Sequence, residues 1–314
     1  MRAVVVETQP KRRLVLRDVA TPVRDAGSAL VNVRAISLNR GEVHTALTSG
    51  AEGDRIGADF SGIVEEAPIG SGFATGDRVV GLFSRAAWAE RIVVPPVRLV
   101  RLPEGVSFDR AAALPVAGLT AMLGLSKKDP IAGQRVLITG ATGGVGMLAI
   151  QLAARAGAHV TAFARAESHR DVLQKLGAEV VAIGSAEAAA AAPYDLILEL
   201  VGGELLGQAL GWLSSRGICV LAGNSGGWTT TFDAHKFRMG DGGGYGGTTL
   251  YGFFLGEELQ RTSAADALAA LVQKVADGSL DPMIGVTKSW SDIQQVASDL
   301  LGRAFHGKAV LTVD

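Results

Sequence analysis

One segment in the middle of the chain constrains the fold more than any other. Residues 137–146 read Leu-Ile-Thr-Gly-Ala-Thr-Gly-Gly-Val-Gly and continue an apolar run that begins at Arg135. Such a run is typical of a strand buried in a parallel sheet, and residues 145–156 predict a helix after it. Glycines at this turn let a pyrophosphate approach the free N–H groups of the helix N-terminus. A glycine-rich turn without a ligand is the alternative. The residues expected to bind cofactor here are Gly140, Thr142, Gly143, Gly144, Val145 and Gly146.

Strand and helix patterns alternate after the glycine segment. Strands are expected at 159–163, 179–183, 194–200, 217–222 and 248–255, and helices at 170–176 and 205–213. Regular alternation of this kind predicts an α/β fold with a doubly wound parallel sheet and right-handed crossovers.

The first third of the chain has a different pattern, with short strands separated by turns. Strands are expected at 3–6, 14–17, 29–35, 61–65, 78–82 and 90–94, with no helix before 108–114. The tail contains helices at 264–276 and 291–301 and a last strand at 308–313, which we expect to complete the N-terminal domain. The predicted domains are therefore 1–116 with 257–314, and 117–256.

Composition excludes several classes of function. With 19% charged residues and a formal net charge of −1, the chain lacks the basic character of a nucleic-acid or anionic-membrane binder. Its one cysteine, Cys219, cannot form an internal disulfide or a cysteine-based zinc cluster. Its N-terminus lacks the apolar core of a signal peptide, and no apolar stretch reaches the roughly 20 residues that span a bilayer. We expect a cytoplasmic protein, in which the glycine-rich residues 240–247 form a mobile loop.

The glycine spacing also fits the Thr-Gly-x-x-x-Gly-x-Gly pattern of short-chain dehydrogenases. That family carries the motif near the N-terminus and requires a Tyr-x-x-x-Lys pair. None of Tyr194, Tyr245 and Tyr251 has a lysine four residues later, so this interpretation is excluded.

Further segments carry a resemblance over nearly the whole chain. They are Gly57–Val64, Gly76–Val79, Leu102–Val106, Ala111–Pro115, Gly118–Ala121, Leu176–Ala178 and Gly307–Val310, together with the glycine segment. With them the chain resembles the zeta-crystallin-like quinone oxidoreductase branch of the zinc-independent medium-chain dehydrogenase/reductase superfamily. The resemblance implies a Rossmann domain inserted into a GroES-like, β-rich catalytic domain, and a homodimer formed through the cofactor sheet. It also implies that Thr120 contributes to the cofactor site.

The residues after the second Rossmann strand indicate which nicotinamide cofactor binds. NAD-preferring domains place an acidic residue there for the ribose 2′-hydroxyl. This chain has Arg165 instead, followed by His169, and a guanidinium suits the 2′-phosphate of NADPH. The alternative is a solvated arginine paired with Glu167. Zinc is not expected, because Ala58–Asp59 stands where zinc-dependent members of the superfamily carry His-Glu.

The expected catalytic segment is Ser37–His44, where the resemblance implies a loop facing the nicotinamide. Asn39 is retained from the family pattern and is expected to hydrogen-bond near the nicotinamide ribose or the substrate oxygen. His44 is expected to donate a proton, with a bystander role as the alternative. The segment 49–56 is shorter than the family's substrate loop. Further cofactor contacts are expected from Gly223, Asn224, Phe253, Phe254, Leu255, Arg303 and Lys308; Phe253, Phe254 and Leu255 are alternatively core residues and Arg303 a solvated helix end.

The expected activity is NADPH-dependent hydride transfer to a quinone or an α,β-unsaturated carbonyl, a small-molecule substrate. Two alternatives stay open. One is reduction of an enoyl thioester in polyketide or fatty-acid metabolism, and the other is a catalytically quiet NADPH-binding protein.

Overall fold

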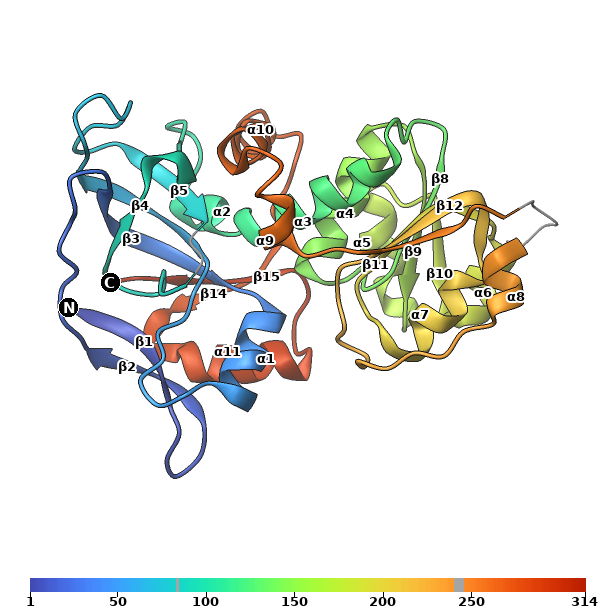
Figure 1. Ribbon diagram of the computed structural model, residues 1–314, viewed down its shortest axis with the longest axis horizontal. Helices are drawn as coiled ribbons and strands as arrows, with labels where there is room; N and C mark the ends of the chain where they lie inside the picture. The colour runs from blue at the N-terminus through green and yellow to red at the C-terminus, as the bar shows by residue number, and fades with distance from the viewer. Residues whose placement is uncertain (83–84, 240–245) are drawn as a thin grey trace. The chain divides into compact units, whose positions relative to one another are not determined.

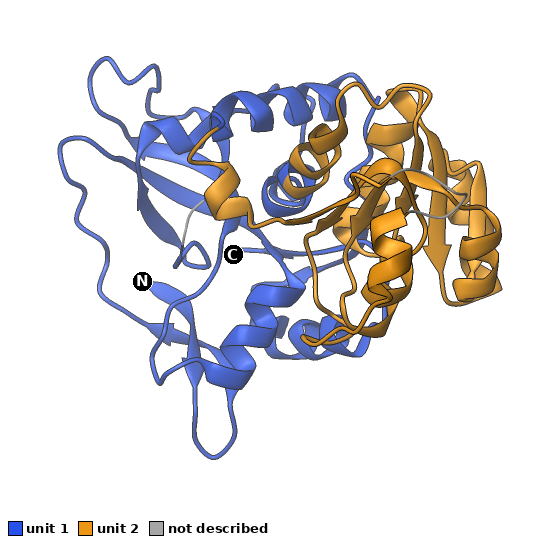
Figure 2. Ribbon diagram, turned by 45° about the vertical axis from the view of Figure 1, so that its right-hand side comes forward, with its two compact units in different colours: residues 1–119, 262–314 blue, residues 120–261 orange. Residues whose placement is uncertain are grey.

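The computed structural model describes residues 1–82, 85–239 and 246–314 (Figure 1). The chain forms two compact units, drawn in different colours in Figure 2. Unit 1 comprises Met1–Leu119 and Thr262–Asp314, and unit 2 comprises Thr120–Arg261. These bounds lie within a few residues of the expected domain boundaries. Residues 240–245 of the glycine-rich segment expected to form a mobile loop lie outside the described residues.

Unit 2 is built on a six-stranded sheet in which every pairing is parallel. Its strands are β8 (Arg135–Ile138), β9 (His159–Ala164), β10 (Val180–Ile183), β11 (Tyr194–Glu199), β12 (Leu213–Leu221) and β13 (Thr249–Gly252). Its helices are α4 (Gly144–Arg155), α5 (Arg170–Lys175), α6 (Gly184–Ala190), α7 (Gly203–Leu210), α8 (Ala234–Met239) and α9 (Leu255–Glu258), with 3-10 turns η2 (Ser126–Lys128) and η3 (Glu167–His169). Helix α3 (Pro115–Leu125) includes the boundary between the units.

The strand order identifies this sheet as the doubly wound type. It runs β10-β9-β8-β11-β12-β13, so the chain order reverses between β8 and β11. Ligands of such sheets bind beyond the carboxyl ends of the strands at this reversal. The glycine segment follows β8 directly and therefore lies at that point. The predicted parallel α/β fold is confirmed.

Unit 1 contains a two-stranded antiparallel ribbon and a seven-stranded mixed sheet. The ribbon is β1 (Arg2–Glu7) with β2 (Arg13–Asp18). The sheet has the order β14-β15-β3-β4-β5-β7, with β6 paired to β3. Its strands are β3 (Ala29–Leu38), β4 (Asp59–Glu66), β5 (Arg78–Leu82), β6 (Arg91–Val94), β7 (Leu99–Arg101), β14 (Ile284–Ser289) and β15 (Lys308–Thr312). The helices are α1 (Arg40–Ser49), α2 (Phe108–Ala112), α10 (Ala264–Ala276) and α11 (Ile293–Gly302), with 3-10 turns η1 (Pro96–Arg98) and η4 (Trp290–Asp292).

The C-terminal tail completes this sheet, as the sequence predicted. Strand β15 pairs antiparallel with β3, and β14 pairs parallel with β15. Trp88, Trp290 and Phe60 are fully buried in the core between these elements. The chain ends thus contribute to one hydrophobic core, which fixes where β15 places its first residue, Lys308.

One structural expectation was wrong. The segment expected as a loop over residues 39–44 is the start of helix α1, with Asn39 as its N-cap in an extended conformation. Only Val43 and Ala46 of this helix are buried, so the sequence carries no apolar stripe that would predict it. Packing stabilises it instead. Helix α1 lies beside α11 (Figure 1), and the Arg40 guanidinium donates to the carbonyls of Leu300 and Leu301 at 2.8 and 3.0 Å.

Candidate active site

The turn between β8 and α4 has the geometry of an anion-binding helix start. Gly140 has φ +56°, a left-handed conformation, and a Cβ at Gly146 would lie 2.4 Å from the Gly140 carbonyl oxygen. Gly143 is exposed and occupies the N-cap position of α4, where no side chain accepts from the first-turn N–H groups. Thr142, Gly144 and Val145 are partly exposed. The first turn of α4 therefore has the free N–H groups and the steric room that a pyrophosphate requires.

A buried carboxylate that we did not predict supports this turn. Glu199, at the carboxyl end of β11, is fully buried and accepts a hydrogen bond from the Thr139 hydroxyl at 3.0 Å. It also accepts the backbone N–H groups of Val201 and Gly202, the latter at 2.7 Å. Burial raises the pKa of Glu199 above its ordinary value. Glu199 thus ties the residue before Gly140 to the turn after β11.

The residues expected to select NADPH lie at the carboxyl end of β9. Arg165 directly follows this strand and is exposed, and His169 ends the 3-10 turn η3. Glu167, the alternative partner of Arg165, is instead bound by Arg170, whose Nη2 donates to it at 2.9 Å. Within the described residues Arg165 forms no ion pair, so its guanidinium is accessible to a phosphate.

The other predicted cofactor residues of unit 2 fall at two neighbouring strand ends. Gly223 and Asn224 follow β12, and a Cβ at Gly223 would lie 2.3 Å from the carbonyl oxygen of Leu200. Phe253 and Phe254 follow β13, and Leu255 begins α9. Phe253 is 9% exposed and Phe254 is 74% exposed, so only the first is a core residue. Thr120 is buried in α3.

Unit 1 contains a buried ionic cluster at the ends of β3, β4 and β15. Asp59 is fully buried, and its Oδ2 accepts from the Ser37 hydroxyl at 2.7 Å and from the Lys308 ammonium at 3.2 Å. Its Oδ1 accepts the Val116 N–H at 2.9 Å. A buried carboxylate needs such partners, because an unpaired charge in the core is strongly destabilising.

Asn39 joins this cluster with both ends of its amide. Its Nδ2 donates to Asp59 at 3.0 Å and to Glu42 at 3.4 Å, and its Oδ1 accepts from Lys308 at 2.7 Å. Both N–H groups of the amide are thus directed at carboxylates, and Asn39 links the start of α1 to β4 and β15.

Lys308, expected at a cofactor phosphate, lies inside this cluster. Its side chain is 3% exposed, and its Nζ donates to Asp59, Asn39 and the Leu38 carbonyl, the last at 3.1 Å. An ammonium has three N–H donors, and all three are used inside the core. Arg303, also expected at a phosphate, is exposed at the C-terminus of α11 with φ +61°.

Glu42 and His44, on the first turns of α1, lie in different environments. Glu42 is partly exposed, and burial of its carboxyl together with the negative charge of Asp59 raises its pKa to about 8. His44 is exposed, and its backbone carbonyl accepts from the Thr48 hydroxyl. Within the part of the chain that the structure describes, no hydrogen bond joins the His44 imidazole to the cluster.

The sequence contained a usable indication of the buried cluster and of Glu199, neither of which we predicted. Asp59, Lys308 and Glu199 each stand at the end of an apolar strand, where a charge is rarely buried without a partner. Asp59 and Lys308 have opposite charges, which could have suggested an ion pair between the distant strands β4 and β15. The roles of Ser37 and Glu42 could not have been found this way, because polar residues at the edges of elements are common.

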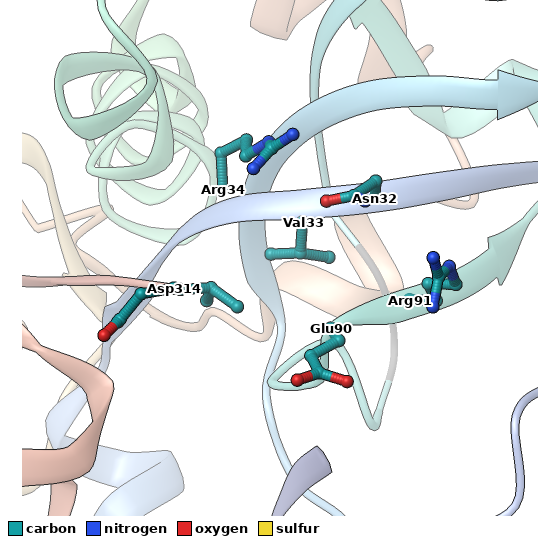
Figure 3. A pocket seen from close by; sticks show the side chains of 7 residues that line it. Asn32, Val33, Arg34, Glu90, Arg91 and Asp314 are labelled. Atoms are coloured by element: carbon teal, nitrogen blue, oxygen red, sulfur yellow. The ribbon is translucent and has the colours of Figure 1, made fainter. Parts of the chain in front are cut away.

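A surface cavity of about 290 Å³ in unit 1 does not belong to this cluster (Figure 3). Its lining residues are Asn32, Val33, Arg34, Glu90, Arg91, Val313 and Asp314. Glu90 pairs with Arg2, and Arg91 pairs with Glu65, so these two charged lining residues are already engaged. No group of three or more metal-ligating side chains occurs among the described residues. Within residues 1–82, 85–239 and 246–314, no helix has both the length and the apolar character that crossing a membrane requires.

Comparison with known proteins agrees with this architecture. Residues 144–273 match the family described as zinc-binding dehydrogenase. The chain is 37% identical over 233 residues to erythronolide synthase EryA2 of Saccharopolyspora erythraea. The aligned region covers 70% of this chain but only 6% of EryA2. The quinone oxidoreductase of Coxiella burnetii superposes with a TM-score of 0.83 and 27% identity, covering 100% of this chain and 99% of that one. The yhdH oxidoreductase of Salmonella enterica, solved in complex with NADP, superposes with a TM-score of 0.79 and 26% identity. The alignment covers 100% of both chains.

The Rossmann order of unit 2 and the GroES-like sheet of unit 1 recur in these structures over the whole chain. The chain is similar over its whole length to the quinone-oxidoreductase branch of the medium-chain dehydrogenase/reductase superfamily, which is a superfamily of oxidoreductases. Both the predicted resemblance and the predicted fold are confirmed.

Proposed function

We propose that the protein transfers hydride from NADPH to a quinone or an α,β-unsaturated carbonyl compound without zinc. The observation that carries this proposal is the uncapped start of α4 at the reversal point of the sheet, with the exposed Arg165 at the end of the next strand. The first feature suits a pyrophosphate and the second a 2′-phosphate. The NADP bound to the Salmonella relative supports the same cofactor.

The nicotinamide supplies the hydride chemistry when it is bound, and the chain supplies binding and electrostatics. In unit 2 we assign the pyrophosphate to residues 140–146 and the 2′-phosphate to Arg165 and His169. In unit 1 we assign to Asn39 the task of holding the start of α1 through Asp59 and Lys308. Residues that donate or position charge where it develops on the substrate oxygen stabilise the transition state more than the ground state.

A second candidate activity is reduction of an enoyl thioester. The 37% identity over 233 residues to erythronolide synthase EryA2 supports it. Quinones, enones and enoyl thioesters all accept hydride at an electron-poor carbon or oxygen, so one cofactor site serves all three.

The test is NADPH oxidation by the purified chain with three acceptor classes: quinones, 2-alkenals and crotonyl thioesters. The proposal expects turnover of quinones or alkenals, with NADPH preferred to NADH. Preferred turnover of the thioester would establish the second candidate instead. Tight NADPH binding without turnover of any acceptor would indicate a catalytically quiet NADPH-binding protein and refute both.

We also propose a cytoplasmic homodimer formed through the cofactor sheet. Within the described residues β13 pairs with β12 alone, so one edge of the sheet remains without a strand. An open edge of this kind is a template for pairing with a second strand. Sedimentation velocity at micromolar concentration tests the oligomeric state. A monomer would refute the proposed dimer.

A further inference from the structure

The strongest unassigned feature of unit 1 is a pair of carboxylates that share one amide. Asn39 Nδ2 lies 3.0 Å from Asp59 Oδ2 and 3.4 Å from Glu42 Oε2. The two acids have opposite surroundings. Asp59 is fully buried and takes a cation, a hydroxyl, an amide and a backbone N–H, whereas Glu42 is partly exposed and takes the longer amide contact and the backbone N–H of Gly57. The Lys308 ammonium thus contacts Asp59 directly, and Glu42 is the more accessible of the two acids.

From this geometry we propose that Glu42 is the general acid that delivers the proton to the reduced substrate. The inference rests on the proposed function, since it names the proton donor of that reaction. It replaces His44, which sequence analysis suggested for this task. Pairs of titratable groups whose surroundings drive their protonation apart mark acid and base assignments in many enzymes.

The charges acting on Glu42 come from two strands. Asp59 of β4 raises the pKa of Glu42, and Lys308 of β15 lowers it with a smaller effect, burial being the largest cause of the rise to about 8. On α1 itself, Arg40 directs its guanidinium to the carbonyls of Leu300 and Leu301. Glu42 therefore carries its proton at neutral pH, which a general acid must do before the reaction.

For an enone, the proposed reaction adds a hydride and a proton across the C=C bond. Hydride from NADPH forms a C–H bond at the β-carbon, and the C=C electron pair moves toward the carbonyl oxygen. The Glu42 O–H bond breaks and its proton forms a C–H bond at the α-carbon, so the substrate is reduced by two electrons and NADPH is oxidised. The Glu42 carboxylate then takes a proton from water. A quinone needs this donor less, because its reduced oxygens can be protonated directly by water.

The first test needs no cofactor or substrate. Infrared difference spectra of the ligand-free protein between pH 5 and 10 should show a protonated carboxyl band that disappears with a midpoint near pH 8. The band should be missing from Glu42→Gln and present in His44→Ala and in Glu104→Gln, which alters an exposed carboxylate. Absence of the band from wild type, or its persistence in Glu42→Gln, would overturn the assignment.

The second test separates proton delivery from folding and from binding. Glu42→Gln should lower alkenal turnover by about 100-fold or more, the usual contribution of a general acid, and remove the loss of activity above pH 8. The NADPH affinity and the quinone turnover of Glu42→Gln should stay within about threefold of wild type. Glu42→Asp should recover part of the alkenal turnover, and His44→Ala should change the alkenal turnover little.

Two results would refute different claims. If wild type reduces alkenals and Glu42→Gln keeps both the rate and the pH profile, Glu42 is not the donor while the proposed function stands. If wild type reduces no acceptor at any pH, the proposed function fails and the assignment of Glu42 fails with it.

Discussion

The buried ion pair between Lys308 and Asp59 yields a quantitative prediction for unit 1. Both side chains are excluded from solvent, with exposures of 3% and 0%. Lys308→Met keeps most of the aliphatic volume but removes the ammonium, leaving the Asp59 charge in the core and two oxygens, Asn39 Oδ1 and the Leu38 carbonyl, without this donor. Breaking a buried pair on one side costs about 3–5 kcal/mol.

The contacts that remain around Asp59 narrow the expected loss in the free energy of unfolding. Asp59 retains the donors from Ser37, Asn39 and Val116, which argues for the lower end, about 3 kcal/mol. For a unit of this size that corresponds to a Tm lower by roughly 6–12 °C. Because removing the second charge as well relieves the stranded anion, Asp59→Asn with Lys308→Met should be less destabilising than the sum of the two single substitutions.

The measurement should report on unit 1 by itself. Hydrogen exchange of the β15 amides, followed by mass spectrometry of C-terminal peptides, gives the free energy of opening where Lys308 lies. Calorimetry of the four proteins then gives the Tm values. A loss below about 1 kcal/mol in Lys308→Met, or additive single substitutions, would show that the pair does not stabilise the unit as reasoned.

Four further outcomes are expected. Arg165→Ala should weaken NADPH binding about tenfold or more and leave NADH unchanged by fluorescence titration, because charged hydrogen bonds contribute about 1.5–3 kcal/mol; equal losses would refute its role. Gly146→Ala places a Cβ 2.4 Å from the Gly140 carbonyl oxygen and should weaken both cofactors alike, whereas Gly105→Ala, with open space around it, should weaken neither. Elemental analysis should find far less than one zinc per chain, and a chelator should leave activity unchanged. Because the pKa of Glu42 is raised to about 8 in the folded chain, its contribution to stability is complete below pH 4.5 and is lost as pH rises through 8; urea unfolding should show this decline, up to about 1.4 kcal/mol per pH unit, relative to Glu42→Gln.

The parallel sheet could be predicted because its strands are apolar on both faces and are separated by helices and glycines. The handedness of parallel crossovers restricts the possible strand orders, and the doubly wound orders have a reversal point beyond which ligands bind. For the tail, the sequence predicted only that its last strand has no nearby partner and joins the N-terminal domain. The choice of β3 as its partner depends on a pairing across about 270 residues, as the contact of Lys308 with Leu38 shows.

The start of α1 could not be predicted for a physical reason that also explains the site. An N-cap asparagine usually accepts from its own helix, and such a residue before an apolar stripe would have indicated a helix. Asn39 makes no side-chain cap bond and turns its amide to Asp59, Glu42 and Lys308. The contacts of this side chain could not be predicted, because Asp59 and Lys308 come from strands far away in the sequence.

Each unit holds its candidate site with one buried carboxylate, but the two carboxylates are satisfied differently. Glu199 accepts only neutral donors, a hydroxyl and backbone N–H groups, so burial prevails and the pKa of its carboxyl rises. Asp59 adds an ammonium to its neutral donors, and its charge then acts outward on Glu42. A neutral amide in place of Glu199 would leave Thr139 and the turn after β11 with fewer acceptors and should disturb cofactor binding. A neutral amide in place of Asp59 would instead remove the charge that adds to the effect of burial on Glu42, so the pKa of Glu42 should fall and the alkaline limit of alkenal reduction should move to lower pH.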